Sequence, residues 1–263
     1  MKLALVSDLH ANLEALDAVL AELERTSPDA RLVCAGDIVG YGPDPEACIA
    51  RLEERGALCV MGNHEEMVLG RRDFSRCVYA GIVAAMWTRS RLSAAARAFI
   101  ERLPSSVHVS GVVVCHGDLT SADTYVSTAK QAEQALAELR SRHPSAEVLV
   151  CGHTHHAALF TRKHGFELAR AGERAFVPPC LINPGAVGQA RDPVPSARFA
   201  VLDTERRRVS FRQVHYDYAT TLRKLRAARL VAQVVLEPPR GVWRRVERYK
   251  ARWARYWAER AAS

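Results

Sequence analysis

The sequence predicts an α/β fold with a strand-rich, α+β second half and a C-terminal helical extension. Over about the first half of the chain, short apolar runs alternate with helical patterns. From residue 157 to 214 the pattern changes to short strands separated by turn residues. Residues 217–263 then carry a basic, aromatic-rich helical pattern, which indicates a separate segment.

The first half gives the clearest pattern. Apolar runs at residues 2–6, 31–35 and 57–61 are typical of buried strands. The first helix is expected to begin at the N-cap Asn12, and the second at Asp44 with Pro45 in its first turn. A strand–helix–strand–helix–strand order predicts a parallel sheet with right-handed crossovers. Ligands of such sheets bind beyond the carboxyl ends of the strands.

The rest of the chain supplies further elements. Residues 65–104 and 129–140 have helical patterns, and residues 111–115, 147–150 and 181–182 read as strands. Hairpin turns are expected at 163–165 and 171–173, and residues 198–203 and 208–214 predict a final hairpin.

Polar clusters end five of the predicted strands. They are Asp8-x-His10, Gly36-Asp37, Gly62-Asn63-His64, His116-Gly117 and Gly152-His153-x-His155. We expect them to meet at one sheet edge. Carboxylates and neutral imidazoles are ligands of borderline divalent ions, and this number of side chains suits two ions better than one. Two ions about 3.5–4 Å apart are an arrangement for phosphoryl hydrolysis.

The order and spacing of these clusters resemble those of the calcineurin-like metallophosphoesterase superfamily. Residues 7–12, 36–43 and 183–189 are similar to its small bacterial and archaeal phosphodiesterase/phosphatase branch. The resemblance covers about residues 1–216, which we take as the metallophosphoesterase domain. It implies a four-layer αββα sandwich.

The resemblance also implies roles for individual residues. Two divalent ions are expected, manganese first, with Fe, Zn, Ni, Co or Mg also compatible. The first ion would be held by Asp8, His10 and His155, the second by Asn63, His116 and His153, and both by Asp37. His64 would be the acid near the leaving oxygen, or alternatively would orient a neighbouring ligand. Asn63 would also steady the developing charge.

One position departs from the family pattern. Many phosphatases of the superfamily carry a second Asp three residues after the bridging one, paired with the catalytic His. Here that position is Gly40, so the sequence leaves open what orients His64. Tyr41 is compatible with a pocket-lining or a packing role. Residues 71–104 could form a substrate-selecting cap or an ordinary helical cover of the sheet.

The net positive charge comes entirely from the C-terminal extension. The formal net charge is +8, and residues 217–263 hold twelve Lys/Arg against four Asp/Glu, so residues 1–216 are neutral overall. On a helical wheel, residues 242–260 separate a Trp/Tyr/Val stripe from an Arg face. A membrane-surface helix or a nucleic-acid contact is compatible with this pattern. We favour a helix docked on its own domain or on a homodimer partner.

Three features of the sequence indicate the cellular compartment in which the protein is expected. No apolar run reaches the length of a membrane span, and the N-terminus is too short and too soon acidic for a signal peptide. The seven cysteines include no C-x-x-C pair and are expected to be small apolar side chains. We therefore expect a cytoplasmic protein.

The expected activity is hydrolysis of a small phosphodiester, phosphomonoester or nucleotide by in-line attack of a metal-bridging hydroxide. One alternative is a nuclease that uses the basic extension to hold backbone phosphates. Another is a non-catalytic scaffold that retains the fold, but every metal-ligand position is filled, which argues against it.

Overall fold

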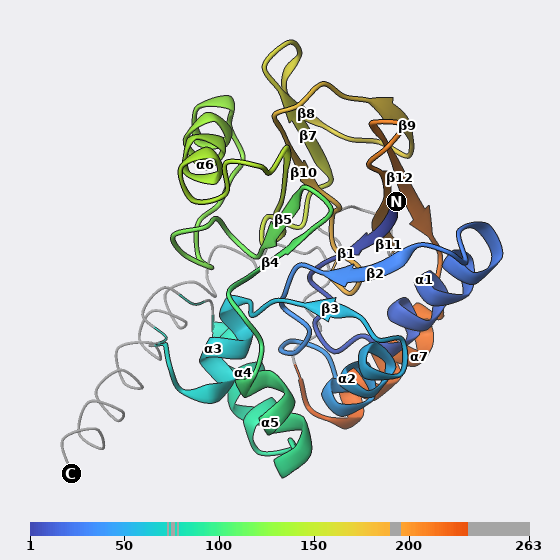
Figure 1. Ribbon diagram of the computed structural model, residues 1–263. Helices are drawn as coiled ribbons and strands as arrows, with labels where there is room; N and C mark the ends of the chain where they lie inside the picture. Colours follow the sequence, from blue (N-terminus) through green and yellow to red (C-terminus); the bar gives the residue numbers. More distant parts are fainter. Residues whose placement is uncertain (73, 75–76, 78, 190–195, 231–263) are drawn as a thin grey trace, which may run out of the picture.

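The computed structural model shows two six-stranded sheets packed face to face between helices (Figure 1). It describes the chain except for residues 73, 75–76, 78, 190–195 and 231–263. The helix predicted at 242–260, with its suggested contacts to membrane, nucleic acid or a second copy, therefore lies outside the described residues. Within the described part, no helix is both long and apolar enough to cross a bilayer.

The first sheet joins strands from both ends of the chain. Its order is β3 (Leu58–Cys59), β2 (Arg31–Cys34), β1 (Lys2–Val6), β11 (Ala197–Asp203), β12 (Arg208–Val214) and β9 (Gly172–Ala175). The parallel pairing of β1, β2 and β3 confirms the crossovers predicted from the alternating pattern, and β11 with β12 confirms the final hairpin.

The second sheet is built from the middle of the chain. Its order is β4 (Ser106–Val109), β5 (Val112–Cys115), β6 (Val148–Val150), β10 (Cys180–Asn183), β7 (Ala158–Thr161) and β8 (Gly165–Leu168). Strands β5, β6 and β10 are parallel. The turn predicted at residues 163–165 connects β7 and β8 in a hairpin.

Helices cover the outer face of each sheet. Helix α6 (Ala129–Arg142) lies on one side of the molecule, and α1 (Leu13–Thr26), α2 (Pro45–Glu54) and α7 (Tyr218–Ala227) lie on the other (Figure 1). The predicted helical stretch 65–104 is three helices: α3 (Asn63–Leu69), α4 (Tyr79–Arg89) and α5 (Ala94–Glu101).

Side-chain alternation along the strands separates three apolar layers. In β1, Leu3 and Leu5 point between the sheets, where Val112 of β5 meets them. The alternate residues Ala4 and Val6 pack in the cluster that includes α1. Leu149 of β6 faces the helix-covered side of the second sheet. Strands β5 and β6 are buried along their whole length and are continuous apolar runs, whereas β8 and β9 are partly exposed. The layers confirm the four-layer αββα sandwich.

Two local predictions were wrong. The turn expected at 171–173 is a crossing between sheets, because Gly172 pairs with Phe211 of β12 rather than with β8. Residues 106–109 form a strand, β4, hairpin-paired with β5 and absent from the predicted elements. In both cases the structure of the segment depends on the strand with which it pairs, and that partner cannot be predicted from the local sequence.

Helix α7 rests on the predicted first domain. Thr221 Oγ1 donates to Glu14 Oε2 at 2.8 Å, and Lys224 Nζ lies 2.9 Å from Asp44 Oδ2. Asp44 begins α2 as predicted, but its side chain makes no capping hydrogen bond. Asn12 does cap α1, accepting from the Ala15 N–H. The domain boundary at residue 216 remains a prediction.

Candidate metal centre

The predicted site residues follow strands at one end of the sandwich, most of them in loops and Asn63 and His64 in the first turn of α3, and both sheets contribute to them. Strands β1, β2 and β3 supply Asp8, Asp37 and Asn63, whereas β5 and β6 of the other sheet lead into His116 and His153. The expectation of a single sheet edge was therefore wrong. Within the loops of the second sheet, the Gly152 N–H donates to the His116 carbonyl at 2.7 Å. The His153 N–H donates to Asp8 Oδ1 at 3.2 Å and so links the loops of the second sheet to those of the first.

The ligand-bearing loops have an unusual backbone. Asp8, His10, Asp37, His153 and His155 have φ between 46° and 65°, a region that L residues rarely adopt. Each such residue costs about 1–3 kcal/mol and persists only where the surroundings fix it. Here backbone hydrogen bonds do so, since the His10 N–H donates to the Asp37 carbonyl at 2.9 Å. The local strain turns these side chains toward one point.

One group of ligands consists of Asp8, His10 and His155, which are all buried. His155 Nε2 lies 3.4 Å from Asp8 Oδ1. His10 Nε2 lies 3.9 Å from the same oxygen and 3.2 Å from His155 Nε2. The structure thus brings together the predicted first ligand set.

A second group consists of Asp37, His116 and His153, again buried, with Asn63 beside it. His116 Nε2 lies 3.2 Å from Asp37 Oδ2 and 3.0 Å from Asn63 Oδ1. Asp37 Oδ2 is also 3.8 Å from His10 Nε2 of the first group. Asp37 therefore occupies the shared position that a bridging ligand needs.

The hydrogen bonds of the imidazoles test whether cations fit here. Nδ1 of His10 faces the Val39 carbonyl at 3.3 Å, and Nδ1 of His155 faces the Gln189 carbonyl at 2.7 Å. Since a carbonyl only accepts, Nδ1 of each neutral ring carries the proton and Nε2 carries a free lone pair. These two lone pairs face one another beside a carboxylate. Such a set of acceptors fits a cation, and a backbone carbonyl on the other ring nitrogen is typical of metal-bound histidine.

The electrostatics of the site agree with this donor set. Burial, and next the neighbouring His64, lower the pKa of His10 well below its ordinary value, which keeps the ring neutral. Burial lowers the pKa of His116, but the charge and hydrogen bond of Asp37 raise it to about 10. A proton therefore competes with a cation for His116 Nε2, and metal affinity is expected to fall as the pH falls.

The structure shows what orients His64. Its ring packs edge-on against His10, with ring centroids 4.8 Å apart, and against Tyr41 at 4.6 Å. Its Nε2 lies 4.0 Å from Asp37 Oδ2. A Cβ on Gly40 would lie 2.3 Å from His64 Nδ1, so the ring occupies the space that a side chain at position 40 would need. Tyr41 and the Gly40 backbone thus hold the His64 ring, a role for which many phosphatases of the superfamily carry an Asp at the position of Gly40.

Gly40→Ala is expected to displace His64 and to lower hydrolysis of alkyl phosphate esters at least about tenfold, because the acid moves from the leaving group. Gly56→Ala is the matched control. Gly56 also has positive φ, +56° against +86°, but its Cβ would meet nothing within 4 Å. In urea unfolding, Gly56→Ala should lose about 1 kcal/mol from its positive φ alone, and Gly40→Ala should lose more because the buried His64 ring must also move. Equal kinetics in the two variants would contradict the packing role of Gly40.

Glu65 is a functional residue that the sequence reasoning missed. It is fully buried, and its carboxylate accepts hydrogen bonds from the backbone N–H groups of Asp37 at 2.9 Å, Gly62 at 2.8 Å and Val39 at 3.0 Å. Burial, and next the charge of Asp37, raise its pKa to about 7. Glu65 ties the loop of Asp37 to that of Asn63. Its position directly after Asn63-His64 was the available signal.

Glu65→Ala is expected to lower the free energy of unfolding by about 3 kcal/mol or more, since three buried amides lose their acceptor. Glu65→Gln keeps one oxygen and should lose less, about 1–2 kcal/mol. The exposed Glu54, which pairs with Arg51, provides the control Glu54→Ala, expected within about 0.5 kcal/mol of wild type. Urea unfolding in EDTA measures all three. If Glu65→Ala matched the control, Glu65 would have no structural role.

Comparison with known proteins places this site in a family. The family model described as calcineurin-like phosphoesterase superfamily domain matches residues 1–207. The chain belongs to that superfamily. A metallophosphoesterase structure from Sphaerobacter thermophilus is 30% identical, with a TM-score of 0.74 over 89% of this chain and 97% of that one.

Two further proteins are similar to this chain over most of their length. An uncharacterized protein from Methanocaldococcus jannaschii is 27% identical over 87% of this chain and 93% of its own. A hypothetical protein from Pyrococcus horikoshii shares the fold, with 16% identity and a TM-score of 0.72 over 89% and 96% of the two chains. The similarity to these proteins therefore covers most of this chain and most of theirs.

The predicted cap region is packed onto the domain. Ala84 of α4 is buried with Leu225 of α7, and Trp87 packs against the same cluster. Arg72 pairs with Glu66 and Asp123 and thereby joins α3 to the loop after β5. These contacts pack the region onto helices α3 and α7 and the loop after β5. Tyr41 packs on both His10 and His64, which is the packing role considered for it, and its pocket-lining role stays a prediction.

Proposed function

We propose that this superfamily member is a phosphoric ester hydrolase that depends on two divalent ions. The observation that supports it best is the shared Asp37, which lies between two buried ligand groups, each with a carboxylate and imidazoles. When bound, two ions supply an activated water and bind phosphate oxygens. The proposed ligands are Asp8, His10 and His155 for one ion, Asn63, His116 and His153 for the other, and Asp37 for both.

The chain's own side chains would do the remaining work. His64, held by Tyr41 and His10, is placed to give a proton to the leaving oxygen as phosphorus–oxygen cleavage proceeds. Asn63, 3.0 Å from His116 Nε2, presents its amide at the same site and would stabilise the charge that develops on phosphate. The proposed ligand side chains are buried, and electrostatic interactions are stronger in such an environment than in bulk water.

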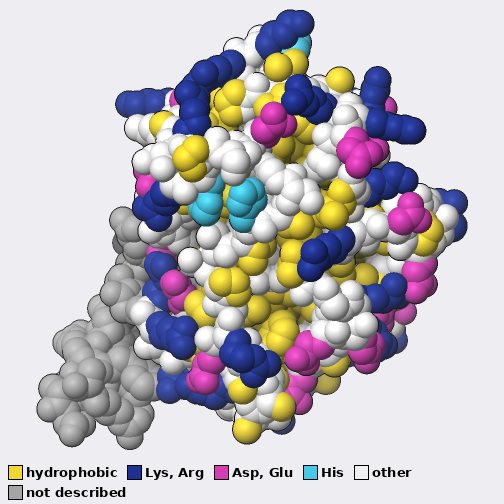
Figure 2. All heavy atoms as spheres, viewed as in Figure 1, with side chains coloured by type: hydrophobic (Ala, Val, Ile, Leu, Met, Phe, Trp, Pro, Cys, Tyr) yellow, Lys and Arg dark blue, Asp and Glu magenta, His cyan; other side chains and the backbone are white. Residues whose placement is uncertain are grey.

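The proposed substrate is a small phosphate ester. The nuclease alternative depends mainly on residues 242–260, which lie outside the described part of the chain. On the face in Figure 2, Lys and Arg side chains are interspersed with Asp and Glu rather than gathered in one stripe. This distribution favours a small substrate over a long polyanion.

The test is hydrolysis of bis-p-nitrophenyl phosphate and p-nitrophenyl phosphate, first in EDTA and then with added Mn²⁺. Turnover that appears only with Mn²⁺ is expected, and the ratio of the two rates reports diester or monoester preference. Zn²⁺, Fe²⁺, Co²⁺, Ni²⁺ and Mg²⁺ in parallel identify the preferred ion. Protein that binds two Mn²⁺ and turns over neither substrate, nor a panel of natural nucleotides, would support the scaffold alternative instead.

A further inference from the structure

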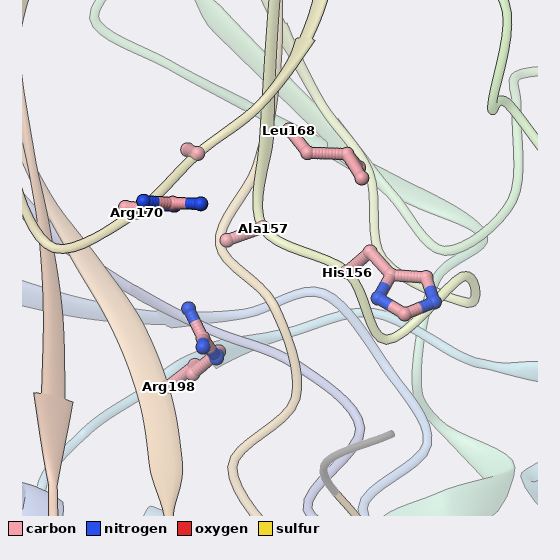
Figure 3. Close-up of a pocket in the computed structure, with 6 residues that line it drawn as sticks. His156, Ala157, Leu168, Arg170 and Arg198 are labelled. Atoms are coloured by element: carbon pink, nitrogen blue, oxygen red, sulfur yellow. The ribbon is translucent and has the colours of Figure 1, made fainter. Parts of the chain in front are cut away.

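A pocket of about 350 Å³ is lined in part by His156, the residue after the proposed ligand His155. Figure 3 shows its lining side chains. The loop before β7, the end of β8 and the start of β11 enclose it. Its lining residues are His156, Ala157, Leu168, Ala169, Arg170 and Arg198. None of the proposed metal ligands lines it, so it is a separate feature of the site.

Strand register places this pocket at the ligand-bearing end of the sandwich. Ala158 of β7 pairs with Asn183 at the end of β10, and also with Leu168 of β8. Strand β11 begins at Ala197 and runs antiparallel to β1, which ends just before Asp8. His156, which lines the pocket, directly follows the proposed ligand His155 in the chain.

Among the described residues that line it, the pocket presents two arginines and no acidic side chain. The guanidinium groups of Arg170 and Arg198 point into the same space near Ala157 (Figure 3). Arg170 makes no hydrogen bond or ion pair with the described part of the chain, which leaves its five N–H donors for a ligand. Arg198 is anchored through its backbone, since its N–H donates to the Ala186 carbonyl at 2.9 Å.

Two guanidinium groups that converge are suited to a phosphate or carboxylate, because each planar fork matches the oxygens of such an anion. The histidine at the rim adds a further donor. Leu168 is 69% exposed beside these charges, and it offers apolar contact to the organic part of a ligand. The lining as a whole fits an organic molecule with an anionic end.

We propose that this pocket is an anion subsite, which holds a second phosphate or carboxylate group of the substrate while the ester phosphate lies at the metal centre. The inference rests on the proposed function and narrows it. The favoured substrates are phosphate esters that carry a second anionic group beyond the one cleaved.

The test uses two chromogenic substrates that differ in one phosphate. Thymidine 5′-(p-nitrophenyl phosphate) is compared with the same ester bearing a 3′-phosphate, both with Mn²⁺. Wild type is expected to prefer the 3′-phosphorylated ester about tenfold in kcat/KM, and Arg170→Gln to abolish most of that preference. Arg198→Gln should act in the same way. Because Arg198 is half-buried, the exposed Arg170 provides the deciding variant.

Arg174→Gln is the matched control. Arg174 is an exposed arginine on β9, where it pairs with Val209, away from the pocket, and its Nη1 donates to the Glu173 carbonyl. The control should keep the full preference. Equal kcat/KM for the two esters in wild type, or a preference that Arg170→Gln and Arg174→Gln lower equally, would overturn the subsite.

A binding measurement separates this proposal from the proposed function. Calorimetric titration in EDTA compares thymidine 3′,5′-bisphosphate, thymidine and inorganic phosphate. The bisphosphate is expected to bind wild type and Arg174→Gln with similar affinity, and Arg170→Gln at least about tenfold more weakly. That result would support the subsite even if neither ester is hydrolysed. If inorganic phosphate alone shows the Arg170 dependence and the bisphosphate does not, the pocket takes free anions and the substrate assignment is wrong.

Discussion

Asp37→Asn is expected to lose bound metal and phosphoesterase activity together. Asp37 is buried between the two ligand groups, and its Oδ1 also accepts from the His64 N–H at 2.9 Å. An amide there keeps the shape but removes the negative charge that both cations would share. Loss of one partner from a buried charged cluster costs about 3–5 kcal/mol, or about 10²–10³ in affinity. Metal content per chain and Mn²⁺-dependent turnover measure the effect.

Asp29→Asn provides the control, because Asp29 is a surface carboxylate 3.6 Å from Lys2 Nζ and far from any proposed ligand. It should keep both the metal and the activity. Full metal content and full activity in Asp37→Asn would exclude the bridging assignment.

His64→Ala is expected to retain metal but to lower the hydrolysis of alkyl phosphate esters by about 10²–10⁴. The reason is that a poor alkoxide leaving group needs a proton as the bond breaks. A p-nitrophenolate leaving group needs it far less, so p-nitrophenyl esters should lose much less activity. The measurement is kcat/KM for an alkyl and a p-nitrophenyl ester of similar size, with metal content determined on the same protein.

The half-buried His143, the C-cap residue of α6, supplies the control, since His143→Ala removes an imidazole that is not one of the proposed site residues. A His64 variant that loses alkyl and aryl ester hydrolysis equally, or that loses metal, would favour the alternative in which His64 only orients a neighbouring ligand.

The sequence by itself determined the position of most elements and all of the proposed ligands. Apolar runs that end in Asp8, Asp37 and His116 report a buried strand followed by a loop, and both properties are local. The Asn12 cap and the β7–β8 turn were predictable for the same reason, because caps and turns depend on a few neighbouring residues.

Tertiary structure alone decided which strands pair. The loops that hold Asp8 and His153 come from different sheets, although the pattern indicated one sheet edge. Strand β9 pairs with β12 at the edge of the first sheet, whereas β8 lies at the edge of the second. Strand pairing is set by packing and register between distant segments, so periodicity within one segment does not contain it.

Tertiary structure also decided how the site residues are supported. The sequence showed that Gly40 replaces an expected Asp, but only the fold shows His64 filling the space above that glycine, held by Tyr41. The same holds for Glu65, whose three amide partners come from two loops, and for the pocket beside Arg170. A motif specifies the chemical groups, whereas their orientation and pKa depend on neighbours that only the folded chain brings within contact distance.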